Sequence, residues 1–197
     1  MDDSGLTQDE RVAVARLHAL LELLPTALDQ HLAPAGLTSF EFTLLEALNE
    51  SDAHRLRMSA LAARTNATLP RLSRVVTTLE RKGLVERAPC LEDGRATNAQ
   101  LTAAGEAAYE ASRSLYATAV RRMVLDGLDA DGVTQLADLS YSILTKLDPD
   151  ARLKVTEAGR ACAADPSGGD SEDLVSCAAD PRLMDSEGPE LAGARAS

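Results

Sequence analysis

The fold of this chain is decided by residues 68–101, which read TLPRLSRVVTTLERKGLVERAPCLEDGRATNAQL. Within 68–82, apolar residues recur every three or four positions, which predicts a helix with one buried face. These apolar residues are Leu72, Val75, Val76 and Leu79. Thr68 is a good N-cap, Pro70 is tolerated in a first helical turn, and Gly83 is typical of the position just after a helix.

A β-hairpin is predicted directly after this helix. The apolar period changes after Gly83, so that 84–87 and 97–101 are the candidate strands. Between them lie Asp93 and Gly94, a pair that readily adopts the positive φ angles of a tight turn. We therefore expect Asp93 and Gly94 to shape the turn and Arg95 to lie at its tip.

The rest of the chain is predicted to be helical up to residue 147. Apolar repeats mark helices over 7–33, 38–48, 58–65, 102–125 and 129–147. Capping-box spacing opens the first two, at Thr7 with Glu10 and at Thr38 with Glu41. Residues 49–54 are interpreted as a polar connection. With only 3% aromatic residues, the core is expected to be aliphatic and the fold class mainly α with a small β-wing.

Four segments follow from these elements. Residues 1–37 hold a first helix whose apolar stripe needs a partner helix, and 38–101 form a winged helix-turn-helix module. Residues 102–148 hold two further amphipathic helices. Residues 149–197 are acidic and include the linker-like 166–171, so we predict a disordered tail there.

The charge of the chain is unevenly distributed. The net charge is −11, which taken alone argues against a nucleic-acid partner. Residues 55–101, here called the basic segment, nevertheless carry nine cations against four anions, a net of +5. Because phosphate binding needs only local positive charge, a basic segment in an acidic chain favours DNA binding by that segment.

Several function classes are not favoured by the sequence. No run of about 18 apolar residues occurs, so no membrane partner is expected. The histidines are not paired at ligand spacing and no glycine-rich phosphate loop or nucleophile motif occurs, so we expect no metal, no cofactor and no enzyme. The odd set of Cys90, Cys162 and Cys177 favours a reduced, cytoplasmic protein.

Five short segments of this sequence resemble the MarR family of winged helix-turn-helix regulators. They are LRMSALA (56–62), LSRVV (72–76), LERKGLVER (79–87), DGRA (93–96) and LTAAG (101–105). The resemblance covers about 10–147, and Pro89-Cys90 with the DGR turn is similar to an actinobacterial branch. It implies a homodimer held by the N- and C-terminal helices, a pseudo-palindromic DNA site, repression, and release by a small, often phenolic or anionic, effector.

The residues that would contact DNA follow from the order of helix, turn, helix and hairpin. A major groove about 12 Å wide admits one helix, whose N-terminal half faces the base edges. We expect Thr68, Pro70, Arg71, Ser73 and Arg74 to lie in the major groove. Thr77 and Arg57 are the expected phosphate contacts. Arg95 is expected to reach the minor groove from the wing.

An effector pocket is expected between the first helix and the basic segment, as the resemblance implies. Its candidate residues are Arg16, Leu24, His31, Phe40 and Leu44. The low aromatic content does not favour a flat aromatic ligand. Two alternatives stay open: the winged helix is a protein-interaction module, or Cys90 beside Arg87 is a redox switch that moves the wing.

Overall fold

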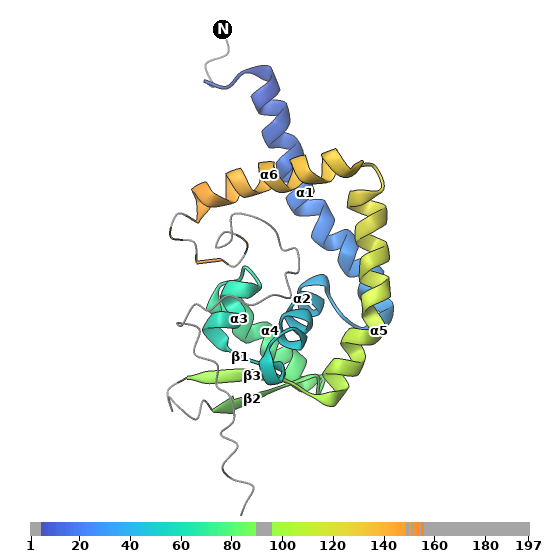
Figure 1. The fold of residues 1–197 in the computed structure, drawn as a ribbon, viewed down its shortest axis with the longest axis vertical. Coiled ribbons are helices and arrows are strands. Elements are labelled where there is room, and N and C mark those ends of the chain that lie inside the picture. The colour runs from blue at the N-terminus through green and yellow to red at the C-terminus, as the bar shows by residue number, and fades with distance from the viewer. Residues whose placement is uncertain (1–4, 90–95, 149, 151, 154, 156–197) are drawn as a thin grey trace, which may run out of the picture.

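The computed structural model describes residues 5–89, 96–148, 150, 152, 153 and 155 (Figure 1). The helices in chain order are α1 (Gln8–Leu32), α2 (Ser39–Asn49), α3 (Met58–Arg64), α4 (Leu69–Arg81), α5 (Ala103–Val120) and α6 (Ala130–Leu147). The strands are β1 (Arg55–Arg57), β2 (Val85–Pro89) and β3 (Thr97–Leu101). Single turns of 3-10 helix follow α1 and precede β1, and a π-helical turn, η3 (Arg121–Leu125), ends α5.

The winged-helix core consists of α2, α3, α4 and the sheet. The sheet is antiparallel in the order β1-β3-β2, with Arg55 opposite Gln100 and Val85 opposite Leu101. The most deeply buried apolar side chains of the core come from α2, α3, α4 and β3, together with one from the end of α1. They are Leu32, Phe42, Leu44, Leu45, Leu48, Leu61, Leu72, Val76, Leu79 and Ala99. The mainly α fold with a small β-wing is therefore confirmed.

Local capping signals account for most helix boundaries. Both predicted capping boxes form, Thr102 and Asp129 cap α5 and α6 through their side chains, and Gly83 adopts φ +72 after α4. Thr68 is the N-cap of α4, as predicted, but its side chain makes no capping hydrogen bond. Pro70 lies in the first turn of the helix.

Strand β1 was not predicted from the sequence, which indicated a polar connection up to residue 54 and a helix from 58. Three residues are too few to display a period of two, and the partner strand lies about forty residues further along the chain. The antiparallel pairing with β3, in which Leu56 lies opposite Ala99, holds β1 in place. The wing therefore has a third strand, located at the start of α3.

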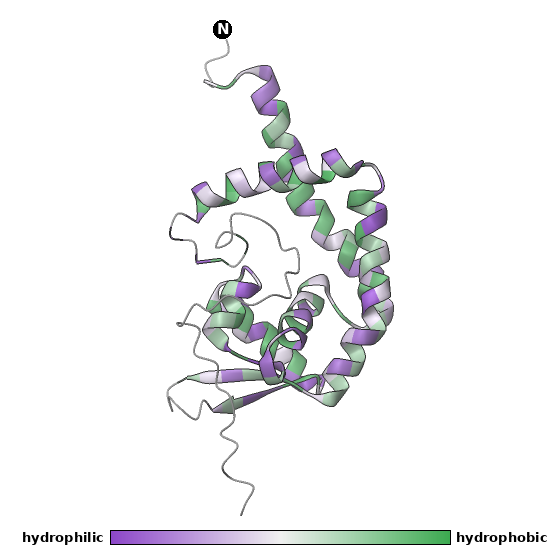
Figure 2. Cartoon of the chain, in the orientation of Figure 1, coloured by the Kyte–Doolittle hydropathy of each residue, from purple (hydrophilic) through white to green (hydrophobic). Residues whose placement is uncertain are grey.

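The helices α1, α5 and α6 extend away from the winged-helix core and carry many apolar residues (Figures 1 and 2). Several of these residues are exposed, among them Leu21 of α1 and Leu139 of α6. In α1 only Leu28 and Leu32 are buried, and no residue of α6 is buried. For α5 the sequence indicates an apolar stripe of Ala104, Ala108, Ala111, Leu115, Ala119 and Met123. Of this stripe only Ala119 is fully buried, and the other buried residues of α5 are Gly105, Tyr109 and Ser112.

Several predicted features lie outside the described residues: Cys90, Asp93, Gly94, Arg95, and the tail from 156 onward. In the part of the chain that is described, no helix is long and apolar enough to cross a membrane. The same described residues contain no group of three or more His, Cys, Asp or Glu side chains placed to hold a metal ion.

Candidate nucleic-acid interface

Helix α4 presents one polar face to solvent and one apolar face to the core. Leu72, Val76 and Leu79 are buried, which directs the alternate positions outward by the helical period. The polar face, which we call the α4 face, consists of the exposed residues Arg71, Ser73, Arg74, Thr77 and Arg81. Thr68, Leu69 and Pro70 are also exposed at its N-terminal end. All the predicted major-groove residues thus share the first two turns of one exposed helix.

Arg71 and Arg74 keep their charges free of acidic partners. Among the described residues, no carboxylate forms an ion pair with either guanidinium. The Arg71 guanidinium lies over the ring of Phe40, with its carbon 4.3 Å from the ring centroid. This cation–π contact leaves the positive charge in place. Arg74, three positions further along α4, is also exposed.

Three other cations of the basic segment pair with acids of the same chain. Arg64 contacts Glu50 at 2.6 Å, Lys82 contacts Glu41 at 2.8 Å, and Arg87 contacts Glu80. Two of these acids, Glu41 and Glu50, lie outside the basic segment, so the count of +5 overstates its free surface charge. Of the other cations, Arg71 and Arg74 lie exposed in the N-terminal half of α4, and Arg81 lies exposed at its C-terminal end.

Lys82 has a structural role that the sequence did not reveal. Its ammonium group donates to both carboxylate oxygens of Glu41 at 2.8 Å and to the carbonyl of Gly36 at 2.9 Å. Glu41 is itself 4% exposed and belongs to the capping box of α2. Lys82 therefore connects the end of α4 to the start of α2.

The hydroxyl groups of Ser73 and Thr77 are partly engaged within the protein. Thr77 Oγ1 donates to the carbonyl of Ser73 at 2.9 Å and accepts from Arg87 Nη2 at 3.1 Å. Ser73 Oγ lies 3.4 Å from the same Nη2. Arg57, the other expected phosphate contact, is half-buried at the end of β1, opposite Asn98. The DNA contacts of these residues remain predictions.

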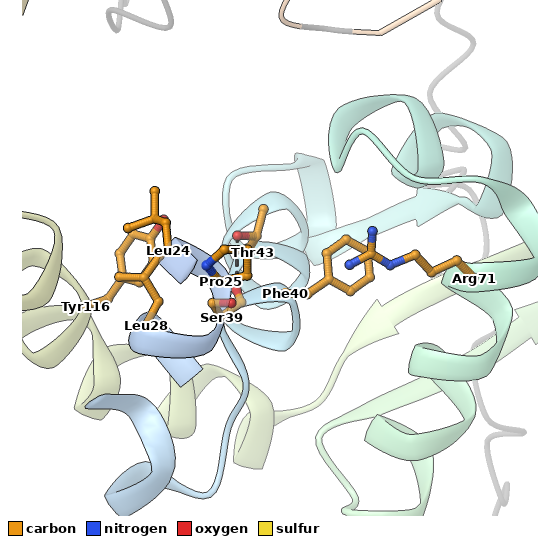
Figure 3. Close-up of a pocket in the computed structure, with 8 residues that line it drawn as sticks. All are labelled: Leu24, Pro25, Leu28, Ser39, Phe40, Thr43, Arg71 and Tyr116. Atoms are coloured by element: carbon orange, nitrogen blue, oxygen red, sulfur yellow. Dashed lines mark hydrogen bonds between the residues drawn. The ribbon is translucent and has the colours of Figure 1, made fainter. Parts of the chain in front are cut away.

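A pocket lies where residues of α1, α2 and α5 meet Arg71 of the α4 face (Figure 3). Its volume is about 230 Å³, and it is lined by Leu24, Pro25, Leu28, Ser39, Phe40, Thr43, Arg71 and Tyr116. The walls are mainly apolar, with the hydroxyls of Ser39 and Thr43 along one side. Arg71 is the one cation among these lining residues, so the pocket suits a small, mainly apolar anion.

The phenol of Tyr116 is neutral at physiological pH. Burial raises the pKa of Tyr116, and the carboxylate of Glu46 raises it further. Burial also raises the pKa of Glu46, with a smaller effect from Glu50. Tyr116 stacks on Phe42 with ring centroids 4.2 Å apart, which fixes its ring against the core. Its hydroxyl is therefore a positioned, uncharged hydrogen-bonding group at the pocket.

Comparison with known proteins identifies the family of this fold. A sequence model of the MarR family matches residues 35–96. The crystal structure of Sco3205, a MarR family transcriptional regulator from Streptomyces coelicolor in complex with DNA, is 32% identical with a TM-score of 0.71. The match covers 75% of this chain and 97% of Sco3205. This chain belongs to the MarR family.

Two further structures agree with this assignment to the MarR family. AbsC, another MarR family transcriptional regulator from Streptomyces coelicolor, is 33% identical over 73% of this chain and 97% of its own, with a TM-score of 0.69. A mutant MarR from E. coli complexed with operator DNA is 27% identical over 69% and 96%, with a TM-score of 0.61. These relatives are transcriptional regulators rather than enzymes, and the Streptomyces matches agree with the actinobacterial branch.

Within this MarR-family chain, the residues expected to line an effector pocket separate into two groups. Leu24 and Phe40 line the pocket, whereas Leu44 is fully buried in the core, and Arg16 and His31 lie exposed on α1 away from the lining. The sequence gave no signal that Arg71 and Tyr116 line this pocket. The apolar stripe predicted for α5 does not include Tyr116.

Proposed function

We propose that this MarR-family chain is a sequence-specific, DNA-binding transcriptional repressor that acts as a homodimer on a pseudo-palindromic operator. The exposed N-terminal half of α4, with Arg71 and Arg74 unpaired by any described carboxylate, carries this proposal. A winged helix of this kind inserts its second helix in the major groove, where an arginine fork binds guanine O6 and N7. The DNA complex of the relative Sco3205 supports the same partner.

The wing and the acidic remainder complete the proposed interface. Arg95 would enter the adjacent minor groove, and Asp93 and Gly94 would shape the turn that carries it. Thr68, Pro70, Arg71, Ser73 and Arg74 would face bases, while Thr77 and Arg57 would contact phosphates. The acidic remainder of the chain repels random DNA, so that binding depends on correct docking of the α4 face.

Fluorescence anisotropy with duplexes from the chain's own upstream region tests DNA binding. Because bound arginines release counterions, log K should fall with log salt by about 0.9 for each phosphate contact. A shuffled duplex of the same composition is the control and should bind far more weakly. Absence of a specific site at low salt would contradict the proposal and favour a protein-interaction module instead.

The homodimer accounts for the exposed apolar surface of α1 and α6. Leu20, Leu21 and Leu23 on α1 are 58–69% exposed, and Leu139 and Leu147 on α6 are 65% and 75% exposed. These residues lie on helices that extend beyond the winged-helix core, as Figure 2 shows. A second copy presents the same helices, so one two-fold contact would cover both apolar faces.

Sedimentation of the full chain is expected to give a species of twice the chain mass of 20.8 kDa. Leu139→Asp should shift the equilibrium toward monomer by at least about tenfold, because it buries a carboxylate in an apolar interface. Thr134→Asp places the same charge on the opposite face of α6 and should leave the dimer intact. Dimers of equal stability in both variants would exclude α6 from the interface.

Release of DNA by a small effector follows from the shared position of Arg71. Arg71 belongs to the α4 face and also lines the pocket, so an anion bound there would compete with DNA for its charge. Phe40 and Tyr116 line the same pocket, and the low aromatic content therefore does not argue against an aromatic ligand.

Benzoate and benzamide distinguish this proposal from non-specific effects. Saturating benzoate is expected to weaken operator binding by about fivefold or more, which is the lower range of allosteric coupling. Benzamide has the same shape without the charge and should have little effect. Equal effects of both compounds, or no effect of benzoate measured by the same anisotropy titration, would argue against an anion site at Arg71.

A further inference from the structure

Arg87 of strand β2 contacts three residues along one side of helix α4. Its Nη1 forms an ion pair with Glu80, and its Nη2 donates to the carbonyl of Ser73 at 3.0 Å and to Thr77 Oγ1 at 3.1 Å. Ser73, Thr77 and Glu80 are spaced by four and three residues, so they form one stripe along α4. A single guanidinium thus spans two turns of the helix.

The register of the sheet explains why Arg87 points at α4. Arg87 lies opposite Ala99, which is fully buried, and two residues from Val85, which is 2% exposed. Opposed and alternate residues of an antiparallel pair share one face of the sheet. Arg87 therefore occupies the rim of the inner, apolar face, where the side chain reaches α4 rather than solvent.

The ion pair is partly removed from water. The side chains of Arg87 and Glu80 are 30% and 28% exposed. A forked guanidinium that satisfies a carboxylate, a carbonyl and a hydroxyl together is geometrically demanding, and lysine cannot reproduce it. The contact therefore constrains the angle between β2 and α4 more than a surface ion pair would.

We propose that Arg87 is a positioning residue that holds the wing at a fixed angle to the recognition helix α4, so that both elements reach DNA together. This inference rests on the proposed DNA-binding function. Arg87 acts through Ser73, Thr77 and Glu80 and directs its charge to α4 instead of a phosphate. The sequence indicates Arg87 as one cation of the basic segment and a neighbour of Cys90, and gives no signal for its contacts with α4.

The direction in which Glu80→Gln changes operator affinity distinguishes a positioning role from a simple charge effect. Removing a negative charge beside bound DNA strengthens binding if only charge matters. If Glu80 positions Arg87, its removal weakens binding instead. Arg87→Lys gives the second distinction, because lysine keeps the charge of a phosphate contact but loses the fork.

The test measures operator affinity and amide hydrogen exchange for the full chain with Arg87→Lys, Arg87→Gln and Glu80→Gln. We expect each variant to weaken operator binding by about tenfold, the effect of one charge-assisted hydrogen-bonding group. Binding to a shuffled duplex should change by less than about twofold, since non-specific binding needs no fixed geometry. Arg113→Gln, a charge loss on the exposed surface of α5 away from α4 and β2, is the matched control.

Hydrogen exchange measured without DNA tests the contact of Arg87 with α4 independently of the proposed DNA-binding function. Faster exchange confined to β2 and α4 in the Arg87 and Glu80 variants, with unchanged exchange of these two elements in Arg113→Gln, supports the positioning role. Unchanged exchange, or tighter operator binding by Glu80→Gln with normal binding by Arg87→Lys, overturns it. If the variants show this exchange pattern but the wild-type chain binds no DNA, the proposed function is refuted and the positioning role is not.

Discussion

Gly105→Ala is expected to lower the free energy of unfolding by about 3 kcal/mol, the upper part of the usual range for overpacked sites. For a chain of this size, such a loss corresponds to a decrease in Tm of roughly 10 °C. The reason is a backbone contact. A Cβ atom at Gly105 would lie 2.0 Å from the carbonyl oxygen of Leu84 and 2.8 Å from a methyl carbon of Leu101.

The carbonyl of Leu84 cannot move away at low cost. It accepts a hydrogen bond from Thr102 N at 3.1 Å, and Thr102 Oγ1 donates to the carbonyl of Gly83 at 2.8 Å. The same Oγ1 accepts from Gly105 N at 3.0 Å and caps α5. A shift of α5 would therefore break the cap and the connection between the wing and the C-terminal helices together.

Gly127→Ala is the matched control for this substitution. No atom lies within 4 Å of the Cβ position at Gly127. The variant should change stability by less than about 0.5 kcal/mol, or increase it slightly by restricting the unfolded chain. Thermal melts followed by circular dichroism compare the two variants with the wild type. Equal melting temperatures for Gly105→Ala and Gly127→Ala would contradict the packing described at Leu84.

Signals confined to a few neighbouring residues predicted the elements well. The capping boxes at Thr7 and Thr38, the glycine after α4 and the apolar period of 68–82 all depend on contacts within four residues. Strand β1 and the inward face of α5 depend instead on distant partners. The close approach of Gly105 to Leu84 and the contacts of the Tyr109 and Tyr116 rings with Phe42 set the rotation of α5.

The candidate site shows the same division. The sequence predicted Arg71 and Arg74, because exposure on a helix follows from its period. Their relation to Phe40, and the ion pairs of Lys82 with Glu41 and Arg87 with Glu80, required the folded chain. A count of charges in the sequence cannot separate cations that are free from cations that stabilise the fold. The placement of Arg95 and Cys90 remains a prediction, since both lie outside the described residues.

Arg74→Ala is expected to weaken operator binding by about 5- to 150-fold per contact, the range for loss of a bidentate base contact. Arg74 is exposed on the second turn of α4, and no described residue forms an ion pair with its guanidinium. Its side chain makes no contact that the fold needs, so Tm should be unchanged. Anisotropy titrations against operator and shuffled duplexes, with melts of the same samples, measure both quantities.

Arg113→Ala is the control for Arg74→Ala, because it removes an exposed arginine from α5 instead of α4. Arg113 lies exposed on α5, where it pairs with Glu110 at 3.1 Å, and its removal should leave operator affinity within about twofold of the wild type. Arg74→Lys then separates the two kinds of DNA contact, because lysine retains the charge for a phosphate but cannot fork onto guanine. A base contact predicts that Arg74→Lys loses operator affinity while keeping affinity for the shuffled duplex. A different result is equal loss of affinity for both duplexes in Arg74→Ala with full affinity in Arg74→Lys. That result would place Arg74 on the phosphate backbone. Arg71 would then be the remaining described arginine in the N-terminal half of α4 that could contact a base.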